Sequence, residues 1–243
     1  MPYRKEQFVN GEIYHIVIKR IADKLLFKDT DDYFRGIFSI FEFNNVHPVE
    51  IYKRRQEIQS FKKRLRETKG GPSSSKLPDV RNLLVEVLFF CFMPNHIHLA
   101  LKQIKEGGIV KFMRKVGTGY GGYLNRKYGR KGYVFQNRFL AVHIKTEEQL
   151  KTVFVYIHTN AVSLIEPKWK EIGIKEPNKI IKFLEDYKWS SYPDYINKNN
   201  FPSVTERDLI LKVMGGEEGC KNFVEGWIKH KVEIKESPEL ALE

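Results

Sequence analysis

The sequence has few cysteines and no long apolar run, and its basic residues outnumber its acidic ones. Cys91 and Cys220 are the only cysteines among 243 residues, and they lie too far apart in the sequence to form a metal-binding pair. We therefore expect Cys91 to be a small buried hydrophobic residue and Cys220 to have no special role. The longest apolar run, around residues 85–93, is too short to span a bilayer.

The composition favours a nucleic-acid partner over a membrane. Residues 1–5 lack the apolar core of a signal peptide, so we expect a cytoplasmic protein with no membrane partner. Lysine and arginine total 42 against 30 acidic residues, which leaves a net charge of +12. Such an excess is typical of proteins that meet a polyanion. The 42% hydrophobic content is enough for one sizeable core with appendages, or for two small domains.

Apolar periodicity predicts alternating strands and helices along the chain. Strands are expected over 12–20 and 83–92, and the apolar residues of 109–127 recur at helical spacing. Another helix is expected to follow the capping residues 29–32. Residues 53–76 contain nine Lys or Arg and two Glu, which predicts a basic helix followed by a flexible loop rich in Gly and Ser.

The segment 91–101 places two histidines one residue apart in an apolar strand. Successive strand side chains point to opposite faces, so His96 and His98 share one face while Ile97 and Leu99 occupy the other. Two neutral imidazoles on one face can hold a divalent cation. The alternative is that the two rings simply form a half-exposed part of the sheet, contacting solvent or each other.

A second polar pair is expected on a helix that begins near Thr146. Thr146 and Gln149 have the spacing of a capping box, which marks the helix start. Tyr156 and Asn160 are four residues apart, so they lie one turn apart at the edge of the buried stripe. The Asn160 amide oxygen could add a third ligand to the two histidines.

The glycines of residues 117–122 match a dinucleotide-binding pattern by chance. They continue a basic amphipathic helix, whereas the dinucleotide motif follows a strand and has an acidic residue downstream. We expect these glycines to let the helix approach another group closely, for example a nucleic-acid backbone, or to loosen the helix.

Four motifs resemble the single-tyrosine HUH transposases, specifically the REP-associated and related insertion-sequence transposases. They are Met93–Leu99, Tyr133–Phe139, Tyr156–Val162 and Trp189–Tyr192, and their order and spacing agree over most of residues 12–192. The resemblance implies an α+β fold, namely a ferredoxin-like or RRM-like antiparallel sheet with helices on one face. It also implies a catalytic domain at 1–165, within which the basic insertion 53–76 lies. Residues 193–243 match no motif of the family. Because residues 204–214 have helical spacing, we expect 166–243 to be a C-terminal helical extension that could read a DNA hairpin or flanking sequence.

The resemblance also implies a mechanism and its residues. Tyr156 corresponds to the nucleophile, and His96, His98 and Asn160 to the ligands of Mg²⁺ or Mn²⁺. The implied reaction is cleavage and rejoining of single-stranded DNA, with hairpin structure, through a 5′-phosphotyrosine intermediate. The protein would act as a monomer or a homodimer. Ala161 departs from the family, in which a proline often follows the asparagine, and the basic insertion has no counterpart in compact relatives.

Basic and aromatic side chains elsewhere are candidate DNA contacts, although solvated charge and core packing are the simpler interpretations. These candidates are Arg20, Lys111, Arg114, Lys115, Arg126, Arg138, Trp189 and Tyr192.

Two other functions stay open at this point. One is a nucleic-acid-binding module that has the fold but no chemistry, against which the four intact site residues argue. The other is a replication-initiating or conjugative nickase of the HUH type. Such nickases usually carry further domains, for which we expect little room in 243 residues.

Overall fold

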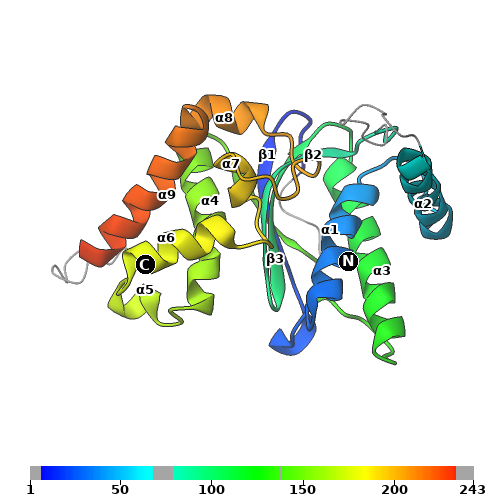
Figure 1. The fold of residues 1–243 in the computed structure, drawn as a ribbon, viewed down its shortest axis with the longest axis horizontal. Coiled ribbons are helices and arrows are strands. Elements are labelled where there is room, and N and C mark those ends of the chain that lie inside the picture. Colours follow the sequence, from blue (N-terminus) through cyan, green and yellow to red (C-terminus); the bar gives the residue numbers. More distant parts are fainter. Residues whose placement is uncertain (1–6, 68–78, 137, 234–243) are drawn as a thin grey trace.

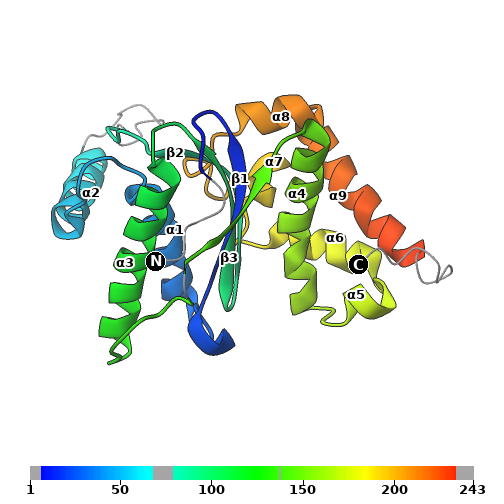
Figure 2. The same ribbon diagram turned by 180° about the vertical axis from the view of Figure 1, so that it is seen from behind.

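The computed structural model describes residues 7–67, 79–136 and 138–233, in which a four-stranded sheet lies between two layers of helices (Figures 1 and 2). The elements in chain order are β1 (Ile13–Lys19), η1 (Ile21–Asp23), α1 (Thr30–Glu42), α2 (Ile51–Glu67), β2 (Val85–Met93), β3 (His96–Gln103), α3 (Gly108–Lys127), β4 (Leu140–Ile144), α4 (Glu147–Thr159), η2 (Asn160–Leu164), α5 (Trp169–Ile172), α6 (Pro177–Asp186), α7 (Tyr192–Tyr195), α8 (Asp208–Met214) and α9 (Gly216–Glu233).

The sheet has the strand order β2-β3-β1-β4, and all neighbouring strands are antiparallel. The connections through α1 and α3 both cross the same face of the sheet (Figure 2). This is the split β-α-β arrangement of ferredoxin-like folds. The predicted α+β class is therefore confirmed.

Alternate residues of the two central strands point to different layers. On β1, Tyr14, Ile16 and Ile18 are buried against α1 and α3, whereas His15 and Lys19 face the other way. The register pairs Lys19 with His96 and places Val17 opposite His98. Because paired residues point to the same side of a sheet, the polar residues of β1 and β3 gather on one face.

The core beneath α1 and α3 is apolar and tightly packed. Asp29 caps α1 by accepting a hydrogen bond from the Asp32 backbone N–H at 3.0 Å, as the capping residues predicted. In α3, a Cβ atom added to Gly119 would overlap the Phe43 ring, which packs directly on the helix backbone. The glycine pattern thus lies in a helix, and Gly119 provides the close approach that we expected.

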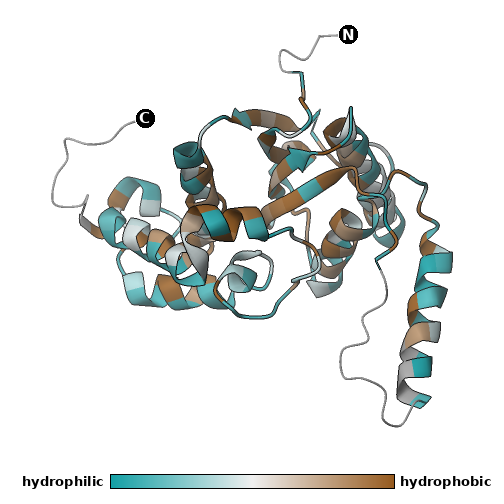
Figure 3. Cartoon of the chain, turned by 90° about the horizontal axis from the view of Figure 1, so that it is seen from above, coloured by the Kyte–Doolittle hydropathy of each residue, from teal (hydrophilic) through white to brown (hydrophobic). Residues whose placement is uncertain are grey.

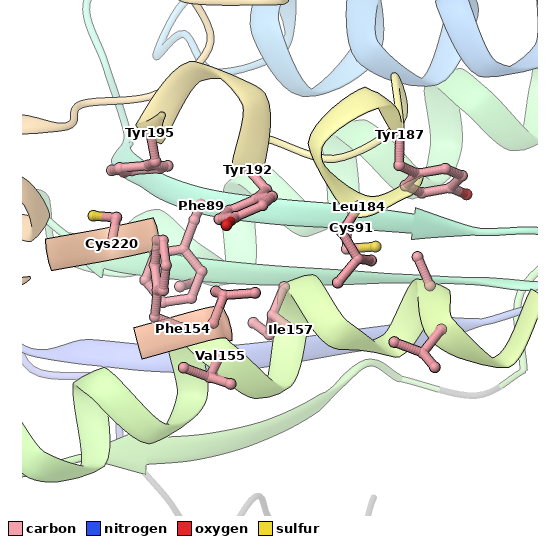
Figure 4. Close-up of a cluster of buried hydrophobic side chains, with 14 of the residues drawn as sticks. Phe89, Cys91, Phe154, Val155, Ile157, Leu184, Tyr187, Tyr192, Tyr195 and Cys220 are labelled. Atoms are coloured by element: carbon pink, nitrogen blue, oxygen red, sulfur yellow. The ribbon is translucent and has the colours of Figure 1, made fainter. Parts of the chain in front are cut away.

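The opposite face of the sheet is covered by α4 and the C-terminal helices (Figure 4). Helices on one face were predicted. This holds for α1 and α3. The second layer is an addition, which buries Phe89 of β2 against Phe154 of α4 and includes Cys91 of β2 in the same apolar cluster. Both cysteines are free, and Cys220 is buried in α9, where it contributes to this core.

The segment that follows α6 closes the outer edge of the sheet. Phe92 donates its backbone N–H to the Trp189 carbonyl at 2.8 Å, and Ser191 donates to the Phe90 carbonyl at 3.0 Å. These bonds satisfy backbone groups of β2 that would otherwise form an open edge. They also tie the C-terminal helices to the sheet that carries the histidines.

Helix α2 extends along the outside of the α1 and α3 layer (Figure 3). It matches the predicted basic helix, while residues 68–76 of the basic insertion lie outside the described residues. Residues 234–243 of the predicted extension also lie outside them. Within the described parts of the chain, none of the helices combines the length and apolar character needed to cross a membrane.

Candidate active site

The two predicted histidines stand side by side on the face of the sheet that α4 covers. The rings of His96 and His98 have centroids 4.8 Å apart and planes inclined by 78°. His98 is only 4% exposed, whereas His96, at the first position of β3, is half-buried. The strand alternation therefore brings both imidazoles to one place, as predicted.

His96 is held by a hydrogen bond at its Nδ1 atom. The Asn95 side-chain oxygen lies 2.6 Å from His96 Nδ1. Because an amide oxygen can only accept, Nδ1 carries the proton in the neutral ring. The lone pair of Nε2 is then free to bind a cation.

A third histidine, His15 of β1, contacts His98. Its Nε2 lies 2.9 Å from His98 Nδ1, and the two rings stack with centroids 5.2 Å apart. If His98 Nδ1 donates in this bond, His98 Nε2 keeps its lone pair, as in His96. The sequence reasoning missed His15, although its position in the alternating strand 12–20 already placed it on the same face as Lys19.

Burial keeps all three rings neutral at physiological pH. It lowers the pKa of His15 to about 4, and burial is also the main cause that lowers the pKa of His96 to about 4. The pKa of His98 falls to about 2, because burial adds to repulsion from His96 and His15. Neutral imidazoles are the form that binds metal ions.

Helix α4 presents Tyr156 edge-on to these rings. Tyr156 is 41% exposed, and its ring centroid lies 5.7 Å from that of His98 and 5.8 Å from that of His15. The Thr146 side chain caps the helix by accepting from the Gln149 N–H at 3.2 Å, as predicted. The phenol is therefore both close to the histidines and open to a ligand.

Asn160 follows one turn after Tyr156, where α4 passes into η2. Its side-chain nitrogen donates to the Tyr156 carbonyl at 2.6 Å, which leaves the Asn160 Oδ1 atom free of that bond. The expected spacing on the helix is confirmed. A role of Asn160 as a ligand stays a prediction.

The polar atoms available here match the needs of a divalent cation. His96 Nε2, His98 Nε2 and Asn160 Oδ1 could supply two nitrogens and one oxygen to such a cation, because the Nδ1 atoms of both rings contact supporting partners. In the described parts of the chain there is no cluster of three or more His, Cys, Asp or Glu side chains arranged around a metal position.

Two lysines add positive charge beside the histidines. Lys19 is paired with His96 across the strands, and Lys170 comes from α5. Both lower the pKa of His98 by repulsion, which places them within electrostatic reach of it. Neither forms an ion pair with any carboxylate in the described ranges, so their charge is available to an anion.

The remaining histidines on nearby elements have structural partners. His158 is fully buried, and its Nε2 lies 3.0 Å from Ser191 Oγ, which in turn accepts from the Phe90 N–H at 2.9 Å. This chain of contacts connects the motif on α4 to the motif at 189–192. His143 contacts Glu12 at 2.8 Å.

Some of the candidate DNA contacts are exposed, whereas others are buried or bonded to neighbouring groups. Tyr192 is 1% exposed and packs in the core, so its ring offers no surface to DNA. Arg20 is also buried, and Lys115 donates to the carbonyls of Asn45 and His47 and so holds that loop. Trp189 is half-buried and stacks on Tyr33 with centroids 4.5 Å apart. The others are exposed or half-exposed, namely Lys111, Arg114, Arg126 and Arg138.

Comparison with known proteins connects this site to a family. Residues 41–160, which include both histidines of β3, Tyr156 and Asn160, match the profile of a family described as "Transposase IS200 like". The solved structure of a REP-associated tyrosine transposase bound to a REP hairpin is similar over 86% of this chain and 93% of its own. The sequence identity is 13% and the TM-score 0.48. No curated protein matches the chain.

Proposed function

Because the chain belongs to the IS200-like transposase family, we propose that it cuts and rejoins single-stranded DNA through a covalent bond between Tyr156 and a 5′ phosphate. The observation that carries this proposal is the packing of the exposed Tyr156 ring against His98, whose neighbour His96 shares the same face. This contact supports the proposal, because it brings a phenol next to two imidazoles. The net charge of +12 suits a DNA substrate.

The chemical step replaces one phosphate ester by another. The Tyr156 oxygen loses its proton and attacks the phosphorus, and the bond from phosphorus to the 3′ oxygen breaks. The products are a 5′-phosphotyrosine and a free 3′-hydroxyl, which conserve the energy needed for rejoining. Attack by the 3′-hydroxyl of another strand on the phosphotyrosine reverses the step and releases Tyr156.

Each surrounding residue has a distinct task in this scheme. His96, His98 and Asn160 would hold Mg²⁺ or Mn²⁺, which when bound polarises the phosphate as a Lewis acid. Asn95 and His15 orient the two imidazoles through their Nδ1 atoms. A phenol has a pKa of about 10 in water, so positive charge nearby is needed to favour its ionised form.

Lys19 and Lys170 are the source of such charge in our proposal. They stand beside the histidines without a carboxylate partner in the described ranges, so they would neutralise the phosphate and the developing phenolate.

The decisive experiment is a covalent trapping assay. The protein is incubated with a pool of single-stranded hairpins and Mn²⁺ or Mg²⁺, and the DNA that stays attached under denaturing conditions is sequenced. We expect an adduct with the unmodified chain and none with Tyr156→Phe. Tyr133→Phe is the matched control, because Tyr133 is 89% exposed and has no part in the proposed chemistry.

The outcomes separate the possible functions. An adduct that persists in Tyr156→Phe would overturn the choice of nucleophile. Absence of cleavage across the whole pool, together with normal DNA binding, would instead indicate a binding module that has no chemistry. The sequences recovered would identify the target.

A further inference from the structure

Three hydroxyl groups at four-residue intervals fasten the segment 187–195 to the outer strand β2. Their hydrogen bonds run from Tyr187 to the Phe92 carbonyl, from Ser191 to the Phe90 carbonyl and from Tyr195 to the Leu88 carbonyl, at 2.7, 3.2 and 2.5 Å. The acceptors are alternate residues of β2, whose carbonyls point to the same side of the strand. Tyr187 and Tyr195 lie at the two ends of this row (Figure 4). The segment is thus held along the whole outer edge of the sheet.

Ser191, in the middle of the row, also forms a hydrogen bond with the helix that carries Tyr156. Its Oγ atom lies 3.0 Å from His158 Nε2 of α4, and the same oxygen accepts the Phe90 backbone N–H at 2.9 Å. Both side chains are fully buried. The contact therefore runs from the nucleophile's helix to β2, which is paired with the histidine strand β3.

Among the described residues, this is the sole hydrogen bond that joins a side chain of α4 to another element. The other side-chain hydrogen bonds of the helix stay within residues 145–160. Elsewhere α4 rests on apolar contacts, such as the edge-on packing of Phe154 against Phe89 with ring centroids 5.2 Å apart. Apolar burial is non-directional, whereas a hydrogen bond restricts both distance and angle. The bond between His158 and Ser191 is thus the directional part of this interface.

His158 and Tyr156 lie on the two flanks of Ile157, which is fully buried in the core. Successive residues of a helix are separated by about 100° around its axis, so the two side chains project to opposite sides of the buried one. A helix with its side chains has a radius of about 5–6 Å, so a rotation of about 10° moves its outer atoms by about 1 Å. A contact that fixes His158 therefore also fixes the direction in which Tyr156 points.

We propose that His158 and Ser191 are positioning residues, which set the rotation of α4 and thereby hold the Tyr156 oxygen where it attacks the phosphate. The proposal rests on the transposase chemistry proposed above. A displacement of about 1 Å in a reacting group can lower a rate about 100-fold. The segment 187–195 thus contributes to the reaction through the helix and not by contact with DNA.

The first test measures the rate of adduct formation with the hairpin pool and Mn²⁺ in a single turnover. His158→Leu removes the bond to Ser191 but leaves that hydroxyl its two bonds to Phe90. We expect the rate at saturating DNA to fall about 10- to 100-fold, while the half-saturating DNA concentration changes less than about twofold. His158→Gln offers an amide in place of the ring nitrogen and should restore most of the rate.

Tyr187→Phe is the matched control for a general loss of stability. It removes a buried hydroxyl bond between the same segment and the same strand, and this bond does not involve α4. It should lower the melting temperature about as much as His158→Leu does but leave the adduct rate unchanged.

Ser191→Ala breaks the proposed contact from its other side, so the test does not depend on the folding of one variant. It should slow adduct formation as His158→Leu does. The double variant should be no slower than the slower of the two single variants, because both residues act through one bond.

A second readout needs neither DNA nor a metal ion. All 12 tyrosines are replaced by 3-fluorotyrosine, and the fluorine NMR signal that is absent from Tyr156→Phe is assigned to Tyr156. Because this ring packs edge-on against His98 and His15, its signal reports its position relative to them. The signal should shift in His158→Leu and stay in place in Tyr187→Phe.

Two results would overturn the proposal. One is an adduct rate in His158→Leu that equals the rate in Tyr187→Phe. The other is a Tyr156 fluorine signal that His158→Leu leaves unmoved. If the unmodified chain forms no adduct at all, the proposed function fails, and the fluorine signal still decides whether His158 sets the position of Tyr156.

Discussion

On β3, Leu99 and Leu101 face α1 and α3, whereas His96 and His98 face α4. The first layer is apolar and closely packed, down to the contact of Phe43 with the Gly119 backbone. The second layer is apolar only where the C-terminal helices cover it, and it becomes polar where Tyr156 is exposed. One strand thus packs the apolar core with one set of side chains and carries the candidate site with the other.

The strongest test of this contrast uses two adjacent residues of β3. Leu99→Ala removes a fully buried side chain and should lower the free energy of unfolding by about 2–5 kcal/mol. His98→Ala should abolish the DNA adduct, while unfolding changes by only about 1–2 kcal/mol, the value of a buried hydrogen bond. Urea denaturation and the trapping assay measure both effects. Equal destabilisation by the two changes would contradict a division of labour between the faces.

The contact between His15 and His98 predicts a loss of metal affinity. His15→Ala removes the partner that fixes the orientation of His98, so binding of Mn²⁺ should weaken about 10- to 100-fold. Titration calorimetry measures this without any DNA. His143→Ala is the control, since His143 contacts Glu12 elsewhere on the sheet and should not alter affinity. A His15→Ala protein with unchanged affinity would show that His98 needs no support.

The buried His158 predicts that stability falls in acid. Burial lowers its pKa from 6.5 to about 3, so below pH 6.5 the unfolded chain binds a proton that the folded chain does not. This contribution is fully present above pH 6.5 and is lost as the pH falls towards 3. At pH 5 the loss is about 2 kcal/mol. His158→Gln should therefore lower by about one the number of protons that the chain takes up on unfolding in acid. An unchanged slope of the unfolding free energy against pH would refute this.

The smallest effects are expected on the apolar side, from two glycines in one helix. Gly119→Ala should destabilise the protein by about 1 kcal/mol, because the new methyl group overlaps the Phe43 ring and the gain in helix propensity only partly offsets this. Gly122→Ala meets no crowding and should stabilise by about 0.5–1 kcal/mol. Thermal denaturation compares the stability of the two variants. Stabilisation by both would mean that the Phe43 ring moves aside readily.

Several features could be predicted because they depend on residues close in sequence. Strand alternation placed His96 and His98 on one face, the capping box at Thr146 marked the start of α4, and the four-residue spacing set Asn160 one turn after Tyr156. The ferredoxin-like sheet and the transposase family followed from four short motifs and were confirmed. The split of the chain at residue 165 stays a prediction.

The tertiary structure alone decided which distant groups meet. His15 contacts His98 from 83 residues away, and Tyr192 is buried although its motif suggested a DNA contact. The periodicity of a strand or helix determines which face a side chain occupies, because that depends only on local backbone geometry. What lies opposite that face depends on strand pairing and helix packing between remote segments, and no local pattern encodes it.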